Sequence, residues 1–121
     1  MSDKQVGGTH YQKSIFDPIW LIDKLKLSFI QGNILKYVYR AKYKNGQEDL
    51  AKAVSYCEIA KDYPNLEITE RRKLLLDSGK WDAITDFCKF NDLDSSFKAF
   101  VISLYFALYE DVVLYIKNLS L

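Results

Sequence analysis

The chain has 121 residues, of which 49% are apolar, and its 17 Lys and Arg residues nearly balance 16 Asp and Glu residues, giving a formal charge of +1. This length supports one buried core, so we expect a single domain over residues 1–121. The near-zero charge excludes the global positive field that duplex-binding proteins use. We therefore expect no duplex nucleic acid as a partner, and any anion site must be local.

The N-terminal segment and the cysteines indicate the compartment. Residues 1–13 are polar and contain no apolar segment typical of a signal peptide. Cys57 and Cys88 belong to no CxxC or Cys/His cluster, so we expect no metal site. Both cysteines are expected to be small buried hydrophobes in a reducing environment. These features predict a cytoplasmic protein.

Two start signals mark the first two helices. Asp17 followed by Pro18 combines a good cap with a residue suited to the first turn, which predicts a helix over about residues 18–27. Ser28 with Gln31 three residues later has the spacing of a capping box, in which each residue satisfies an amide of the other. A second helix is therefore expected to begin directly after Ser28.

The second and third helices are expected to form a tight antiparallel hairpin, over about residues 29–44 and 47–63. Asn45 and Gly46 end the first of these helices because both residues tolerate the left-handed conformation of a helix end. Pro64 requires the other helix to stop before it, since the residue preceding a proline avoids helical geometry. This hairpin is the predicted centre of a compact all-α helical bundle.

The second half of the chain, residues 64–121, is expected to be a helical extension for packing and oligomerisation. Thr69 can cap a short helix that ends at Ser78 and Gly79, and Asp94 or Ser95 begins the last one. No segment shows sustained period-two alternation, which favours an all-α bundle over a sheet. One face of an intervening helix carries apolar residues, namely Trp81, Ile84, Phe87 and Cys88.

The last helix is predicted to be long and apolar. The stretch of residues 99–109 is almost entirely apolar, but Glu110 and Asp111 interrupt it before the ~20 residues needed to cross a bilayer. We therefore expect no membrane partner, and burial in the bundle or in a subunit interface instead. The spacing predicts a homo-oligomer with a helix-to-helix seam formed by Phe100, Leu104 and Leu108.

A stripe of charged and hydrogen-bonding side chains runs along each helix of the predicted hairpin. Residues three, four and seven positions apart lie on one helix face. Lys and Arg one turn apart hold phosphate by charge-assisted hydrogen bonds and stack on a base. A solvated helix face is the alternative interpretation. The two stripes consist of Asn33, Lys36 and Arg40, and of Asp49, Lys52 and Tyr56.

Three further residues have a binding interpretation and a structural one. His10 is the only histidine and follows a glycine pair, so it either contacts a phosphate or is a structural loop residue. Gly32 lowers helix propensity by about 1 kcal/mol relative to Ala, which indicates close backbone packing or ligand approach. Asp49 either binds a ribose hydroxyl or magnesium, or orients Arg40 or Lys52; we favour the orienting role.

The segment His10 to Tyr56 resembles an uncharacterised domain family common in tailed-phage genomes. It is also similar to the C-terminal part of a phage-encoded nucleotide kinase that lacks a conventional phosphate-binding loop. The resemblance covers about residues 9–60. It is carried by THY at 9–11, DPI at 17–19, GNILKY at 32–37, Arg40-Ala41, Lys44 and DLAKA at 49–53. It implies as ligand-binding positions His10, Tyr11, Asn33, Lys36, Tyr37, Arg40, Lys44, Asp49, Lys52 and Tyr56.

The resemblance and the residues together predict a phage-type protein that binds a nucleotide or nucleotide-derived ligand in the host cytoplasm and sequesters a host-defence signal without turnover. A nucleoside monophosphate kinase and a protein-interaction module are the alternatives. A helical pyrophosphatase would need several clustered carboxylates for magnesium, and in the hairpin Glu48 neighbours Asp49 whereas Glu58 lies off the Asp49 stripe. We expect no bound cofactor, with Mg²⁺ required only for a kinase.

Overall fold

The computed structural model describes residues 17–42, 46–63 and 79–119. Throughout these ranges the regular structure is helical, without a strand, which confirms the all-α prediction. No helix in these ranges is long and apolar enough to cross a membrane. The helices are α1 (Pro18–Leu25), α2 (Phe29–Ala41), α3 (Gly46–Ala60), α5 (Lys80–Phe90), α6 (Ser95–Tyr105) and α7 (Tyr109–Lys117).

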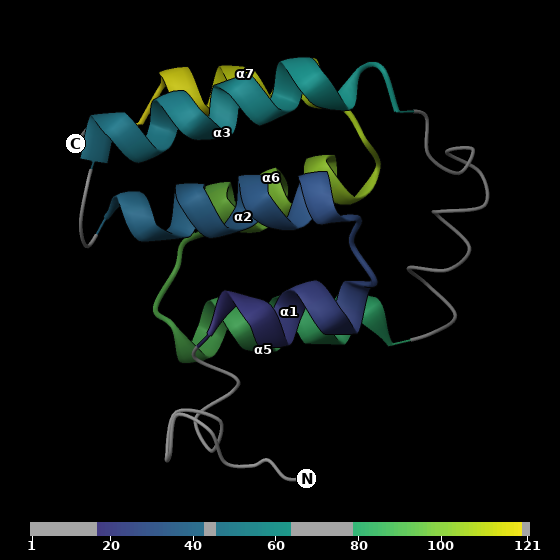
Figure 1. The fold of residues 1–121 in the computed structure, drawn as a ribbon. Helices are drawn as coiled ribbons and strands as arrows, with labels where there is room; N and C mark the ends of the chain where they lie inside the picture. The colour runs from purple at the N-terminus through teal and green to yellow at the C-terminus, as the bar shows by residue number, and fades with distance from the viewer. Residues whose placement is uncertain (1–16, 43–45, 64–78, 120–121) are drawn as a thin grey trace, which may run out of the picture.

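The helices form two layers (Figure 1). In one layer α1, α2 and α3 lie side by side, and in the other α5, α6 and α7 lie behind them, so that α1 faces α5, α2 faces α6 and α3 faces α7. Between the layers lies the apolar core, to which every helix contributes. One fully buried side chain from each helix illustrates this: Leu21, Ile34, Cys57, Phe87, Val101 and Val112.

The predicted start signals are confirmed. Asp17 Oδ1 accepts a hydrogen bond from the Ile19 amide at 3.0 Å. The Gln31 amide donates to Ser28 Oγ at 3.1 Å, and the Ser28 amide donates to Gln31 Oε1 at 3.2 Å, which completes the capping box. Gln31 Nε2 also donates to the Leu104 carbonyl at 2.9 Å. The first turn of α2 is therefore fixed to the end of α6.

The prediction of one long apolar C-terminal helix is wrong, because this segment forms two helices, α6 and α7, with a turn between them. Ala107 has φ 60°, which is left-handed. Its amide donates to the Leu104 carbonyl at 3.0 Å, and the Leu108 amide donates to the Ser103 carbonyl at 2.9 Å. These two bonds satisfy the carbonyls at the helix end in a Schellman motif, which allows the chain to reverse and α7 to pack on α3.

The predicted subunit seam is also wrong for two of its three residues. Phe100 and Leu104 are buried in the core of one chain, and only Leu108, at 38% exposure, reaches the surface. A charge at Leu104 would therefore unfold the chain instead of separating subunits. Trp81 is likewise exposed, not buried with its predicted face, because it lies on the outside of α5 beneath Lys98 Nζ, 4.5 Å from the ring centroid. The expectation of a homo-oligomer stays a prediction.

Helices α2 and α3 lie side by side along their length (Figure 1). The turn of the predicted hairpin, residues 43–45, lies outside the described residues, as does the helix expected after Thr69. Gly32 has a structural explanation: a Cβ atom there would lie 3.2 Å from Ile22 Cγ2, so the glycine allows α1 and α2 to approach closely.

Candidate functional site

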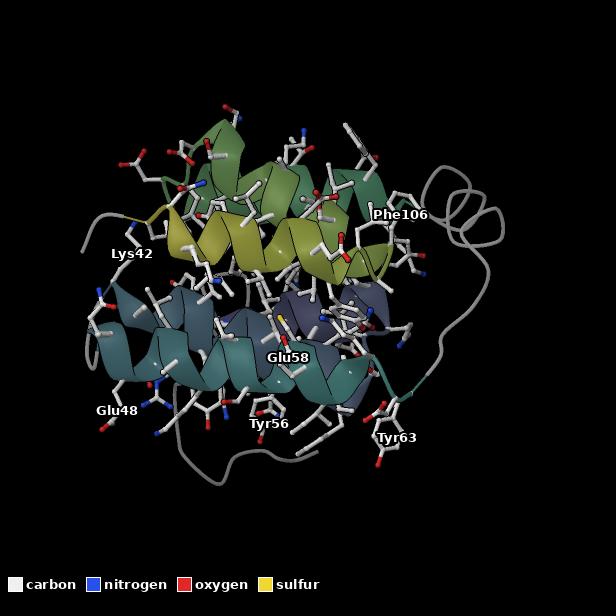
Figure 2. All side chains as sticks on the ribbon, turned by 90° about the horizontal axis from the view of Figure 1, so that it is seen from above. Lys42, Glu48, Tyr56, Glu58, Tyr63 and Phe106 are labelled. Atoms are coloured by element: carbon white, nitrogen blue, oxygen red, sulfur yellow. The ribbon has the colours of Figure 1, made fainter. Side chains whose placement is uncertain are left out.

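Two tyrosines stack across the outer edge of the α2–α3 pair. Tyr37 on α2 and Tyr56 on α3 have ring centroids 6.0 Å apart and ring planes inclined by 18°. Figure 2 shows Tyr56 on the edge of α3 that faces away from α7, with Glu48 and Tyr63 along the same edge. Both rings are partly buried against the core, which holds the pair in place while leaving part of each ring accessible. We refer to Tyr37 and Tyr56 as the aromatic pair.

Three cationic groups surround the Tyr37 ring. Lys36 Nζ lies 4.6 Å from the ring centroid, Lys52 Nζ 5.5 Å and Arg40 Cζ 5.9 Å. Lys36 and Arg40 extend from one flank of α2, whereas Lys52 comes from α3. Cations within about 6 Å of a ring are attracted to its electron-rich face, but they repel one another. The result is a local concentration of positive charge on a chain of formal charge +1.

Asp49 is the unexpected member of this group, because its side chain is 0% exposed. Within the described residues neither of its carboxylate oxygens accepts a hydrogen bond. Arg40 Nε lies 3.9 Å from Asp49 Oδ2, which is an ion pair but too long for a hydrogen bond, and the Arg40 side chain is 39% exposed. This geometry fits the predicted orienting role: the buried carboxylate attracts one side of the guanidinium and leaves its outer side open.

The other predicted residues are placed less centrally. Lys52 also pairs with Glu48 at 3.8 Å, an exposed contact that contributes little to stability. Asn33 Nδ2 donates to the Phe29 carbonyl at 3.1 Å within α2, so the structure does not bring its amide to the aromatic pair. His10, Tyr11 and Lys44 lie outside the described residues.

A hollow that the sequence did not indicate lies beside this site, between the start of α1 and α2. Its volume is about 350 Å³, and Lys36 and Arg40 form part of its wall. A start signal such as Asp17-Pro18 predicts where a helix begins but not which helix it meets, so no sequence signal could have located this hollow. The described residues that line it are Asp17, Pro18, Ile19, Lys36, Tyr39 and Arg40.

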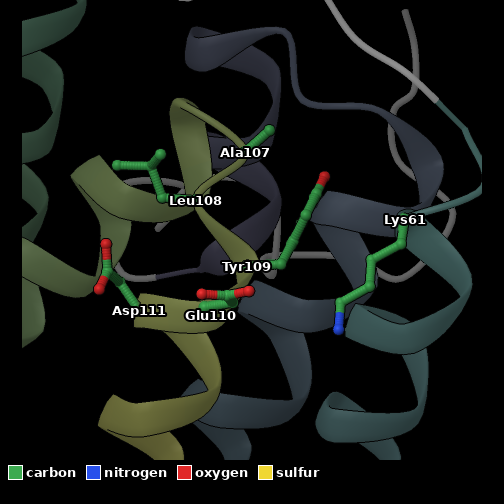
Figure 3. Close-up of a pocket in the computed structure, with 6 residues that line it drawn as sticks. All are labelled: Lys61, Ala107, Leu108, Tyr109, Glu110 and Asp111. Carbon is green, nitrogen blue, oxygen red and sulfur yellow. The ribbon is translucent and has the colours of Figure 1, made fainter.

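Two further hollows share no residue with the cationic group. Lys61 at the end of α3 and the segment 107–111 line one of about 410 Å³ (Figure 3). The other, also about 410 Å³, lies between α2 and the ends of α5 and α7 and includes Lys42, Asp94 and Tyr115. Among the described residues that line them, neither has a fully buried charged side chain, so we favour the α2–α3 face as the ligand site.

The two cysteine thiols are not part of the candidate site. Burial raises the pKa of Cys57 to about 12, and burial likewise raises the pKa of Cys88. Both side chains are buried in the core, as predicted, and a protonated buried thiol is unreactive. Among the described residues no three His, Cys, Asp or Glu side chains gather in a group that could hold a metal ion.

Comparison with known proteins gives a similarity to one family but no activity. A family described as a protein of unknown function (DUF3310) matches residues 6–58. The match spans the start of α1 to most of α3 and so includes the whole cationic group. No curated protein and no solved structure matches the chain. The similarity to an uncharacterised family is thus supported, and nothing in this match connects the chain with a nucleotide kinase.

Proposed function

We propose that this protein binds a nucleotide or nucleotide-derived ligand on the outer face of α2 and α3 and holds it without turnover. The observation that carries the proposal is the Tyr37 ring, which stacks on Tyr56 and has Lys36, Arg40 and Lys52 within 5.9 Å of its centroid. Aromatic and cationic groups in contact match the two chemical parts of a nucleotide, the base and the phosphate.

The groups that would contact the phosphate are better defined than those that would contact the base. Three like charges around one ring repel one another; Asp49 and Glu48 offset part of this repulsion, and an anion placed among the cations relieves the rest. Arg40 offers a planar set of donors for two phosphate oxygens, while the two lysines offer point charges. Asp49 prevents the Arg40 side chain from extending freely into solvent, because the guanidinium stays near the buried carboxylate. An arginine held in this way loses less conformational freedom on binding.

The base part is assigned to the accessible side of the aromatic pair. Its two rings already contact each other, so a base stacks on the outside of the pair and not between its members. Stacking on a tyrosine is worth about 1–3 kcal/mol per base and tolerates any base, so this contact supports nucleotides as a class without choosing among them.

Holding a ligand unchanged has its own consequence. A protein that binds a nucleotide signal and does not consume it lowers the free concentration of that signal, which is the sequestering role expected for a phage protein. A kinase is the alternative that rests on the sequence resemblance alone. A protein-interaction module is favoured by the exposed Phe29 and Tyr63.

One experiment separates these functions. The purified protein is incubated with a nucleotide panel that includes cyclic and ADP-ribose-type molecules, separated from free ligand and heated, and the released compound is analysed. Unchanged ligand in stoichiometric amount supports a binder, and a nucleoside diphosphate formed from a monophosphate supports a kinase. Absence of any bound nucleotide rejects both and favours the interaction module.

Matched variants locate the site. Lys36→Gln is expected to weaken the binding of the recovered ligand at least tenfold, as expected for loss of one charge-assisted bond of about 1.5–3 kcal/mol. Lys98→Gln is the control, because Lys98 Nζ also lies over an aromatic ring, that of Trp81 at 4.5 Å, but on α6. Equal affinity in both variants, measured by calorimetry at fixed salt, places the ligand elsewhere.

A further inference from the structure

Lys36 and Arg40 each border two different surfaces. On one side they approach the Tyr37 ring, at 4.6 and 5.9 Å from its centroid. On the other side they line the hollow at the start of α1. They therefore form a cationic ridge, and a group bound on this ridge is adjacent to both the aromatic pair and the hollow.

The hollow has walls suited to a ring and not to a second phosphate. Pro18, Ile19 and Tyr39 provide apolar surface, and its volume of about 350 Å³ lies within the range of small-molecule sites. Ile19 is 66% exposed although it is a large aliphatic residue at the first turn of a helix. The Asp17 carboxylate at the rim repels a further anion and can accept a hydrogen bond from a neutral donor.

The walls are also fixed in place before any ligand binds. Asp17 accepts the Ile19 amide at 3.0 Å, and Pro18 restricts the first turn of α1. The Tyr39 hydroxyl donates to Asn91 Oδ1 at 3.0 Å, and the Tyr39 ring packs on Phe87 with centroids 5.7 Å apart. A cavity whose walls are held by both layers binds a ring without first reorganising.

From this arrangement we infer that the ligand is two-ended: two nucleobase-sized rings joined through phosphate. One ring stacks on the aromatic pair, the linking phosphate lies on the ridge of Lys36 and Arg40, and the second ring enters the hollow beside Ile19. This inference rests on the proposed function, since it uses the same cations, and it extends that function to a defined chemical class, the dinucleotide-type ligands.

The test compares two probes of equal charge. Ribonucleoside 5′-monophosphates of the four bases carry the same formal charge as the corresponding dinucleoside 5′,5′-pyrophosphates, so the two probes differ by a second nucleoside phosphoryl unit without a difference in formal charge. At ~25 cal/mol per Å², removing about 60 Å² of apolar ring surface from water corresponds to about tenfold tighter binding. We expect the two-ended probe to bind about tenfold more tightly than the monophosphate for at least one base.

Ile19→Ala tests the position of the second ring. It is expected to remove most of the advantage of the two-ended probe and to leave monophosphate affinity unchanged. Leu114→Ala, which trims an exposed aliphatic side chain on α7, is the control and should change neither affinity. Because Ile19 is largely exposed, circular dichroism should show the same helical signal in all three proteins.

The possible failures are distinct. If the monophosphate binds and Tyr37→Leu abolishes that binding, but the two-ended probe has no advantage, the two-ended ligand is rejected and the proposed function stands. The same holds if the advantage survives Ile19→Ala. If neither probe binds the wild-type protein, the proposed function and this inference are both rejected.

Discussion

Helix α2 packs against α6 along one edge and against α3 along the other, and each of these contacts includes one completely buried polar side chain. The two side chains, Gln31 and Asp49, differ in how many hydrogen bonds they make. Gln31, at the edge against α6, makes hydrogen bonds with Ser28 and with the Leu104 carbonyl. Asp49 lies on α3, where that helix packs against α2. It receives no hydrogen bond from the described residues, and its ion pair with Arg40 is 3.9 Å long. A buried polar group with satisfied partners stabilises a fold, whereas an unsatisfied one calls for a functional explanation. The difference separates an edge whose buried polar group has its partners from the edge at which we propose that the ligand binds.

The largest expected effect tests the edge of α2 against α6. Leu104→Ala removes a fully buried side chain from α6 and should lower the free energy of unfolding by about 3 kcal/mol through lost burial and the cavity left behind. Ligand affinity of the remaining folded protein should be unchanged. Denaturant unfolding with calorimetric binding measures both quantities. A loss of affinity without a loss of stability would place Leu104 in the ligand site and invalidate the comparison.

Gln31→Leu should cause a smaller loss of stability. The Ser28 amide would lose its acceptor, and the Leu104 carbonyl would lose the Gln31 side chain while keeping its backbone donors, among them the Ala107 amide at 3.0 Å. We expect a decrease in unfolding free energy of about 2 kcal/mol, the cost of an unsatisfied buried group. Gln47→Leu, at an exposed position in the first turn of α3, is the matched control. Equal stability of the two variants would show that the Gln31 contacts contribute little.

Alkaline pH should weaken the core by a further, smaller amount. The unfolded Cys57 thiol loses its proton near pH 9, whereas burial raises its folded pKa to about 12. Stability is therefore complete below pH 9 and falls as the pH rises towards 12, by about 1 kcal/mol at pH 10. Cys57→Ala should reduce this slope, with a remainder from Tyr115, whose pKa burial also raises to about 12. An unchanged slope in denaturant unfolding between pH 8 and 10 would contradict the assignment.

The smallest change in stability is expected at the edge of α2 against α3. Asp49→Asn removes a buried charge that has no hydrogen-bond donor, so the unfolding free energy should stay within about 1 kcal/mol of wild type or rise. Ligand affinity should nevertheless fall several-fold, because Arg40 loses the carboxylate that orients it. Arg40→Met in the Asp49→Asn background completes a double-mutant cycle. Additive losses of affinity would show that the two side chains act independently.

The starts of α1, α2 and α6 were predictable because their signals are local. Asp17 and Pro18, Ser28 and Gln31, and Asp94 all cap within three residues of their own position, and the structure contains each contact. Local hydrogen bonds of this kind depend on side-chain type and spacing, both of which a sequence displays directly.

Helix ends and the binding site were harder to predict because their causes are not local. Left-handed residues that are not glycine follow α1, α5 and α6, namely Lys26, Asp92 and Ala107, so the usual glycine signal was missing. Asp49 was expected on a surface stripe, since aspartate is rarely buried, and its burial depends on how closely α3 lies against α2.

The two-layer arrangement limits how this chain can be divided. The family match at residues 6–58 corresponds to one layer, α1 to α3, whose inner side chains are covered by α5, α6 and α7 (Figure 1). An excised fragment ending at residue 63 would expose fully buried residues such as Leu21, Ile34 and Cys57 to water. It would be a poor module for transplantation. Any protein that reuses this half must provide a second apolar layer of its own, and that layer is free to differ in sequence as long as it covers the same surface.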